Sequence, residues 1–235
     1  MSRHYKKYIF DTNKYNFYNL LSSLFNHQNL ETIHEKLGDL EQFTMANNSN
    51  TECHKAFYAK LKEGWPELES MYESFLSEFI LEIVGEEFIF QKWPTLRTHV
   101  PNNWATPEYH RDSQEGYNHP HGEINFLLPF TKCHDTNTLW SESEADKGDF
   151  QPIQMEWGEL VTFNGSQCRH GNKINKTPIS RVTCDFRVLP LSKYDPDDIK
   201  VSHTTGTRFE LGHYYKKLRH PEQAQGHFPD YTQTR

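Results

Sequence analysis

The sequence is poor in cysteine and has no long apolar segment. Only four of its 235 residues are cysteines, and because none is in a Cys-x-x-Cys spacing, a disulfide framework is not expected. The apolar runs are far shorter than the roughly 20 residues that a bilayer span needs. The first residues run from lysines into polar side chains instead of an apolar segment, which argues against export. These absences predict a soluble, cytoplasmic protein with reduced thiols.

The sequence also has no block of like charge. It carries 25 Lys and Arg against 32 Asp and Glu, a formal net charge of -7, and the two signs are interleaved. A protein that binds a phosphate backbone needs a basic patch, so neither nucleic acid nor a membrane is an expected partner. A small-molecule substrate is expected instead, with no pattern that sets the oligomeric state. The length fits a single domain over residues 1–235.

Residues 1–85 have a helical pattern. Apolar side chains recur at helical spacing in three segments. The expected helices span Phe17–Phe25, Cys53–Leu61 and Pro66–Val84. The last of them has Pro66 in its first turn and Gly85 just past its end, as the preferences of helix termini require. This helical N-terminal part is expected to pack against the rest of the domain.

From residue 86 the pattern changes to short alternating runs. These runs are rich in β-branched and aromatic residues and are separated by Gly, Pro, Asn and Asp. Strands are predicted at Phe88–Trp93, Leu96–Val100, Glu123–Phe130, Pro152–Trp157, Glu159–Phe163, Gln167–Gly171 and Arg181–Leu189. Such a series is typical of a β-sandwich or barrel. Residues 86–190 are therefore the expected core, and in the polar tail 191–235 the aromatic cluster Phe209–Tyr215 is expected to fold back as a flap.

Two histidines and an aspartate form a candidate metal site. In an extended segment, residues i and i+2 point to the same side, so His110 and Asp112 can present a nitrogen and an oxygen to one ion. After the predicted strand 159–163 the chain turns back, and His170 then begins a neighbouring antiparallel strand. Three protein ligands leave one face of the ion open for a cosubstrate and dioxygen, as catalysis requires.

A strand with one polar face follows His170. Arg181, Thr183, Asp185 and Arg187 alternate with apolar residues and therefore share a face. An arginine can bind a carboxylate through two parallel hydrogen bonds, and a threonine hydroxyl adds a further donor. The pattern predicts an anchor for an acidic cosubstrate at Arg181 and Thr183.

Together these motifs resemble those of the iron(II)/2-oxoglutarate-dependent oxygenases. The segments Tyr109–Asp112, Gly122–Phe130 and Ser180–Arg187 are similar to the phytanoyl-CoA-hydroxylase-like branch called streptomycin-biosynthesis-type, and the likeness covers roughly residues 88–215. The resemblance implies an α+β, mainly β fold. Its core is expected to be a double-stranded β-helix (jelly roll, cupin-like) with N-terminal packing helices.

The resemblance also implies a site and a reaction. His110, Asp112 and His170 would bind Fe(II) and carry catalysis, and Arg181 with Thr183 would bind the distal carboxylate of 2-oxoglutarate. Because halogenating relatives lack the carboxylate that Asp112 supplies here, hydroxylation is expected. The implied dioxygenase uses O2, hydroxylates a small polar metabolite of a sugar-like class, and releases succinate and CO2.

Other residues allow other assignments. His121 and Glu123 also satisfy the i, i+2 spacing and are a rival ligand pair, although they run directly into the next strand. Arg187 is a second candidate for the anchor, and Asn125 for contact with the cosubstrate. Candidates for the substrate wall are Gln91, Arg97, His99 and also Asn125. Tyr214 and Tyr215 are candidates for closing over the site.

Two alternative functions share part of this pattern. A non-oxygenase cupin-like protein, such as a sugar isomerase or a metal-binding sensor, would need a glutamate farther along the chain than Glu123. A zinc-dependent hydrolase can use two histidines and an aspartate, but it would leave Arg181 and Thr183 without a role.

Overall fold

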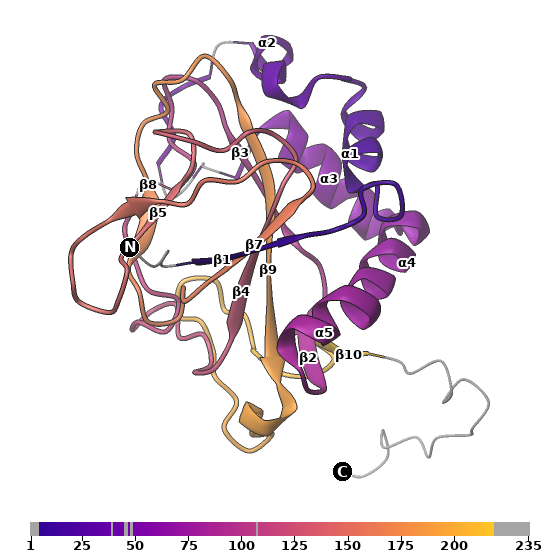
Figure 1. The fold of residues 1–235 in the computed structure, drawn as a ribbon, viewed down its shortest axis with the longest axis vertical. Coiled ribbons are helices and arrows are strands. Elements are labelled where there is room, and N and C mark those ends of the chain that lie inside the picture. The colour runs from indigo at the N-terminus through magenta and orange to yellow at the C-terminus, as the bar shows by residue number, and fades with distance from the viewer. Residues whose placement is uncertain (1–4, 39, 45–46, 48, 107, 219–235) are drawn as a thin grey trace.

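The computed structural model describes residues 5–218 except 39, 45, 46, 48 and 107, and Figure 1 shows its ribbon. Helices occupy much of the N-terminal part, as the sequence predicted. They are α1 (Phe17–Phe25), the 3-10 turn η1 (Leu30–Thr32), α2 (His34–Leu37), α3 (Glu52–Glu63), α4 (Pro66–Phe75), the π-helical turn η2 (Leu76–Ile80) and α5 (Leu81–Val84). The last three follow one another without a break, so the helix expected at 66–84 is present.

A large antiparallel sheet forms the centre of the molecule. Its strands are β1 (Tyr5–Ile9), β2 (Phe88–Gln91), β3 (Thr95–His99), β4 (Ile124–Pro129), β7 (Glu159–Phe163), β9 (Arg181–Pro190) and β10 (Tyr215–Lys217). Their order is β1-β7-β4-β9-β2-β10, and β3 also pairs with β9. The long strand β9 therefore lies beside β4 on one side and beside β2 and β3 on the other.

A small antiparallel sheet lies on one side of the large sheet, and the helices lie on the other (Figure 1). Its strands are β5 (Leu139–Ser141), β6 (Gln151–Pro152) and β8 (His170–Asn172), in the order β6-β5-β8. A short 3-10 turn, η3 (Leu191–Lys193), follows β9. The described part of the chain is thus mainly β, with helices added on one face.

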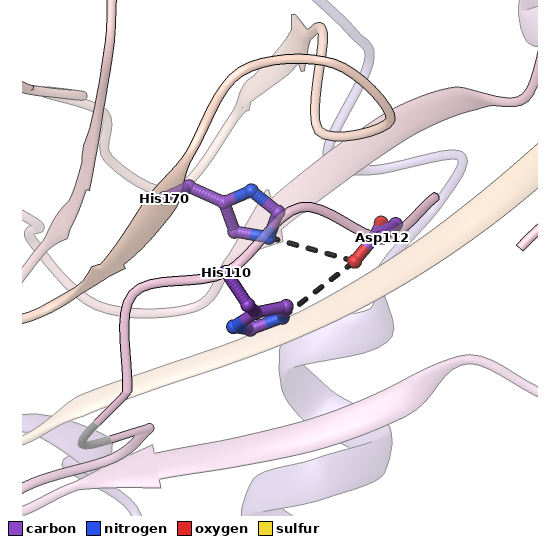
Figure 2. A group of neighbouring side chains, drawn as sticks. All are labelled: His110, Asp112 and His170. Atoms are coloured by element: carbon purple, nitrogen blue, oxygen red, sulfur yellow. Dashed lines mark ion pairs between the residues drawn. The ribbon is translucent and has the colours of Figure 1, made fainter. Parts of the chain in front are cut away.

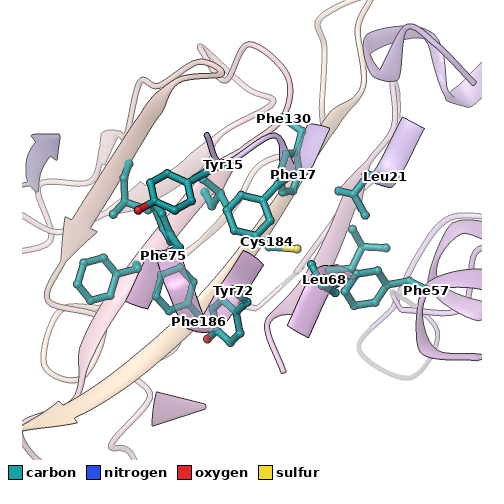
Figure 3. Packing of buried hydrophobic residues seen from close by; sticks show 14 of the residues in the cluster. Tyr15, Phe17, Leu21, Phe57, Leu68, Tyr72, Phe75, Phe130, Cys184 and Phe186 are labelled. Atoms are coloured by element: carbon teal, nitrogen blue, oxygen red, sulfur yellow. The ribbon is translucent and has the colours of Figure 1, made fainter. Parts of the chain in front are cut away.

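Two apolar clusters hold these layers together. The larger lies between the helices and the large sheet, where Tyr72 of α4 contacts Phe186 of β9 edge to face at 5.4 Å between ring centroids (Figure 3). Within the sheet, the rings of Phe126 and Phe186 stack at 5.1 Å. The smaller cluster lies between the two sheets and includes Leu127 and Leu139. The alternation of β4 explains this division, because Phe126 and Leu127 point to opposite faces.

The structure corrects several expected elements. Tyr5–Ile9 is a strand that pairs with β7, whereas the sequence pattern indicated helix. The strand expected at Pro152–Trp157 is reduced to β6 and an isolated bridge between Cys133 and Met155. The strand β5 was not predicted. These short strands are defined by long-range backbone pairing rather than by their own composition.

The aromatic cluster of the C-terminal part folds back onto the sheet, where Tyr215 begins strand β10. It does not form the expected flap, since neither Tyr214 nor Tyr215 lines the cavity beside His110 and His170. β10 pairs with β2, and Tyr215 is fully buried. The rest of the expected tail, residues 219–235, lies outside the described residues. Within the described ranges, no helix has both the length and the apolar character to cross a bilayer.

Candidate metal centre

His110, Asp112 and His170 converge at one point between the two sheets (Figure 2). One ligand atom from each lies within 4.8 Å of the others. The Nε2 atoms of His110 and His170 are 3.7 Å and 3.6 Å from Oδ1 of Asp112. All three side chains are nearly inaccessible to solvent. The three residues that the sequence pattern predicted to form one site therefore lie together in the structure.

Backbone pairing produces this convergence. The amide of His110 donates to the carbonyl of His170 at 3.0 Å, and the amide of His170 donates back at 2.9 Å. The amide of Asp112 then donates to the carbonyl of Gly165 at 2.9 Å. Residues 110–112 thus form an extended edge beside β8 and the preceding turn. This pairing places His110 and Asp112 on the side that His170 also faces.

The second nitrogen of each imidazole fixes its tautomer. Nδ1 of His110 lies 3.1 Å from the carbonyl oxygen of Glu108, and Nδ1 of His170 lies 3.0 Å from that of Cys168. Because a carbonyl oxygen only accepts, each Nδ1 carries the hydrogen. The lone pair of each Nε2 is therefore directed toward Asp112, which is the usual arrangement of a metal-binding histidine.

The protonation states also suit a cation. Burial lowers the pKa of His110 to about 4, and burial likewise lowers the pKa of His170. Burial opposes ionisation of Asp112, yet the guanidinium of Arg187 holds the pKa of that carboxyl well below its usual range. Near neutral pH the group therefore consists of two neutral imidazoles and a carboxylate. Metal binding needs these forms.

The two oxygens of Asp112 have different partners. Oδ2 accepts hydrogen bonds from Nδ2 of Asn125 at 2.6 Å and from Nε of Arg187 at 2.9 Å. Oδ1 faces the two imidazoles. The donor set, with two nitrogens and one carboxylate oxygen on neighbouring strands, fits a divalent transition metal with open coordination positions.

A cavity of about 50 Å³ lies beside the triad. Its walls include His110, His170, Asn125, Arg181, Thr183 and Arg187. Arg181 is buried, its Nε has no hydrogen-bond partner, and no carboxylate of the described residues lies within ion-pair distance of it. Burial lowers the pKa of Arg181 to about 10. A buried guanidinium without a counterion is suited to an acidic ligand.

Arg187 has a different environment from Arg181. Besides Asp112, its guanidinium contacts Asp185 at 3.2 Å and Glu123 at 3.8 Å. The network continues from Asp185 to Nε of Arg97 at 2.9 Å. Sequence reasoning did not identify this network, because nothing in the alternation of β9 shows which acids lie opposite it.

Charged side chains of both signs meet at the cavity. Arg97, Arg181, Arg187 and Asp185 line it, and Asp112 and Glu123 contact Arg187. Among the described residues, Arg181 has no carboxylate within ion-pair distance, so its charge is available to an anionic ligand.

The rival pair His121 and Glu123 does not form a site. His121 is exposed. Glu123 is buried and accepts hydrogen bonds from the hydroxyl of Tyr215 and from Nδ1 of His119, the latter at 2.8 Å. Among the described residues, the only group with metal-binding geometry contains neither of them.

The candidates for the substrate wall divide into two groups. Arg97 and Asn125 line the cavity. His99 is buried between the carbonyl oxygens of Asn103 and Asn137 instead. Gln91 accepts from the hydroxyl of Tyr214 at 2.9 Å and thereby anchors the C-terminal segment.

Comparison with known proteins gives one relative in sequence and several in structure. No protein-family model matches the chain. Streptomycin biosynthesis protein StrG of Streptomyces griseus is 35% identical over 172 residues, which are 73% of this chain and 79% of that protein. The fold is similar to the non-heme alpha-ketoglutarate-dependent carbocyclase SnoK from nogalamycin biosynthesis, with a TM-score of 0.55, 12% identity and 92% of each chain covered.

A second structural neighbour is EctD from S. alaskensis in its apoform. It has a TM-score of 0.56 and 13% identity, with 92% of this chain and 82% of that chain covered. The same enzyme has also been solved with bound Fe, at a TM-score of 0.51. At these identities the likeness concerns the fold.

Proposed function

Because the chain belongs to the iron(II)/2-oxoglutarate-dependent oxygenases, we propose that His110, Asp112 and His170 hold the iron. The family resemblance that the sequence motifs indicated is confirmed. Fe(II), 2-oxoglutarate and O2 are the cofactors of this family. The observation that carries the proposal is the position of Oδ1 of Asp112, which faces both Nε2 atoms at 3.6–3.7 Å.

Arg181 and Thr183 are proposed to bind the distal carboxylate of 2-oxoglutarate. Both are buried on the wall of the cavity beside the triad. The absence of a carboxylate partner for Arg181 within the described ranges supports this role. The rival anchor, Arg187, already has Asp112 and Asp185 as partners. Asn125 contacts Asp112 and is proposed to act on the metal side of the cavity.

The proposed reaction is hydroxylation of an unactivated C–H bond, for which the iron and the 2-oxo acid supply oxygen activation with release of succinate and CO2. The protein residues bind and orient the reactants and exclude water from the cavity. The carboxylate of Asp112 supports hydroxylation over halogenation, because on a bound metal it would take the place that a halide would need.

We propose that both sheets belong to a double-stranded β-helix within one oxygenase domain. Strands β3, β9, β4 and β7 would form one wall, and β5, β6 and β8 the other. The antiparallel pairing and the metal triad between the two sheets support this assignment. In this proposal residues 1–85 cover the core, residues 86–190 form it, and residues 191–235 are an extension of which the described part, through β10, packs on β2.

The substrate is proposed to be a small polar, sugar-like metabolite. A groove of about 1110 Å³ shares Phe163 with the lining of the cavity. Its other walls carry apolar residues, such as Ile83 and Ile124, and also charged or amide groups, such as Glu144, Lys147, Asp149, Gln151 and Asn164. The polar groups would serve as hydrogen-bond partners for a ligand with several hydroxyl or amino groups.

Anaerobic titration tests the proposal. Wild-type protein should bind Fe(II) and then 2-oxoglutarate, and on addition of oxygen it should form succinate. His110→Ala should lose iron binding, and Arg181→Ala should lose 2-oxoglutarate binding with iron binding retained. His121→Ala is the matched control and should behave as wild type. The proposal fails if His121→Ala abolishes iron binding while His110→Ala does not, or if no keto-acid-dependent oxygen consumption occurs.

A further inference from the structure

Arg187 lies on β9 and contacts the metal triad through Asp112. It is opposite Asn125 in the register of β4 and β9, and only 8% of its surface is exposed. Its Nε donates to Oδ2 of Asp112 at 2.9 Å, and its Nη1 donates to Asp185 at 3.2 Å. The guanidinium thus contacts the aspartate of the triad directly.

A second donor acts on the same oxygen of Asp112. Nδ2 of Asn125 lies 2.6 Å from Oδ2. The two hydrogen bonds to Oδ2 fix the rotation of the carboxyl group. A rotation that broke either bond would leave a buried polar group without its partner, which costs free energy. The carboxylate is therefore held with Oδ1 toward the imidazoles.

We infer that Arg187 is a positioning residue that presents one oxygen of Asp112 to the metal. The inference rests on the proposed ligand set and changes the role of Arg187 from a possible cosubstrate anchor to a partner of a ligand. Its guanidinium has a fixed planar shape, so a bond through Nε to Asp112 and a bond through Nη1 to Asp185 set its orientation. Arg181, six residues earlier on the same face, has no such partner among the described carboxylates.

Other charges hold Arg187 itself in place. Asp185 is shared between Arg187 and Arg97, with distances of 3.2 Å and 2.9 Å. Oε2 of Glu123 lies 3.8 Å from Nε of Arg187. The other oxygen of Glu123 accepts a hydrogen bond from the hydroxyl of Tyr215. The ion pairs of Arg97, Asp185 and Arg187 connect β3 and β9 with Asp112 of the triad. Side chains that orient a metal ligand in this way typically change metal affinity by about 10–100-fold when they are replaced.

The test compares arginine variants from the same face of β9. Arg187→Lys keeps the charge and loses the planar pair of donors, and Asn125→Ala removes the other bond to the same oxygen. Arg181→Met is the matched control. Cobalt(II) is titrated anaerobically into each purified protein, with the affinity and the visible d–d spectrum of the bound ion as readouts. Circular dichroism of the metal-free variants checks that each is folded.

The expected result is a 10–100-fold loss of cobalt affinity and an altered spectrum for Arg187→Lys and Asn125→Ala. Arg181→Met should keep the wild-type cobalt affinity and spectrum and lose affinity for 2-oxoglutarate. Wild-type cobalt affinity and spectrum in folded Arg187→Lys would overturn the inference. Loss of 2-oxoglutarate affinity alone in that variant would also overturn it, because an anchor behaves in that way.

The proposed function and this inference fail differently. If wild-type protein binds neither Fe(II) nor cobalt(II), or if His110→Ala binds cobalt as tightly as wild type, the ligand set itself is wrong. If the wild type binds metal through His110 and the Arg187→Lys variant is unaffected, only the positioning role is wrong.

Discussion

A Cβ atom at Gly165 would lie 2.8 Å from the side-chain amide nitrogen of Asn125. Such a distance is too short for a stable contact, so only glycine leaves room for Asn125 at this point. The same glycine offers its carbonyl oxygen to the amide of Asp112 at 2.9 Å. One small residue therefore determines the position of both the metal-facing aspartate and its amide partner.

Gly165→Ala is expected to lower metal affinity about tenfold, because the methyl group displaces Asn125 from Asp112. Cobalt(II) titration measures the effect. In an Asn125→Ala background the clash is absent, so adding Gly165→Ala should have little further effect. Additive losses in the double variant would show that the two residues act independently, contrary to the contact.

Thr183→Val should weaken 2-oxoglutarate binding about fivefold, which corresponds to the loss of one hydrogen bond in a buried site. The substitution nearly preserves the shape of a side chain that is 2% exposed. Anaerobic titration of the iron-loaded protein measures the affinity, and the iron affinity should not change. An unchanged dissociation constant for 2-oxoglutarate would remove Thr183 from the proposed anchor.

Phe126→Ala should lower the free energy of unfolding by about 3–5 kcal/mol, the usual cost of a large cavity in a core. The ring of Phe126 is fully buried and stacks on Phe186 with an interplanar angle of 7°. Urea unfolding of the metal-free protein measures the change. Ile9→Thr is the control, since Ile9 is 69% exposed, and it should change stability by less than about 0.5 kcal/mol. Equal effects of the two substitutions would contradict the layer arrangement.

The stability of the metal-free protein should fall as the pH drops from 6.5 toward 4, in part because of His54. Burial lowers the pKa of this ring to about 4 from 6.5, so between these values the unfolded chain binds a proton that the folded chain does not. The free energy of unfolding then decreases by up to about 1.4 kcal/mol per pH unit for this one group.

His54→Gln should make that decrease less steep by the same amount. Urea unfolding at several pH values between 4.5 and 6.5, with a chelator present, measures the slope. If His54→Gln keeps the wild-type slope, His54 is not a neutral buried ring.

The local parts of the site could be predicted from sequence. The i, i+2 rule is a property of any extended segment, so it predicted the shared direction of His110 and Asp112. The alternation of β9 predicted in the same way that Arg181 and Arg187 share a face. Helices α1, α3 and α4 were predictable because their apolar side chains repeat within a few residues.

The long-range parts could not be predicted. Strand β1 contains two lysines in five residues, and it is a strand because it pairs with β7, more than 150 positions later. The different partners of Arg181 and Arg187 also depend on register, because Asn125 stands opposite Arg187 and Asp112 reaches it from another segment. Composition contains no information on such pairings.

Strand β1 has one more consequence, for assembly. It covers one side of β7, whose sequence Glu-Leu-Val-Thr-Phe contains no lysine or arginine. β1 itself forms the outer edge of the sheet and carries Lys6 and Lys7, charges that discourage another chain from adding to it. An N-terminal fusion or truncation that detaches these five residues would expose the backbone edge of β7. Another copy of the chain could then pair with that edge, and the protein would self-associate.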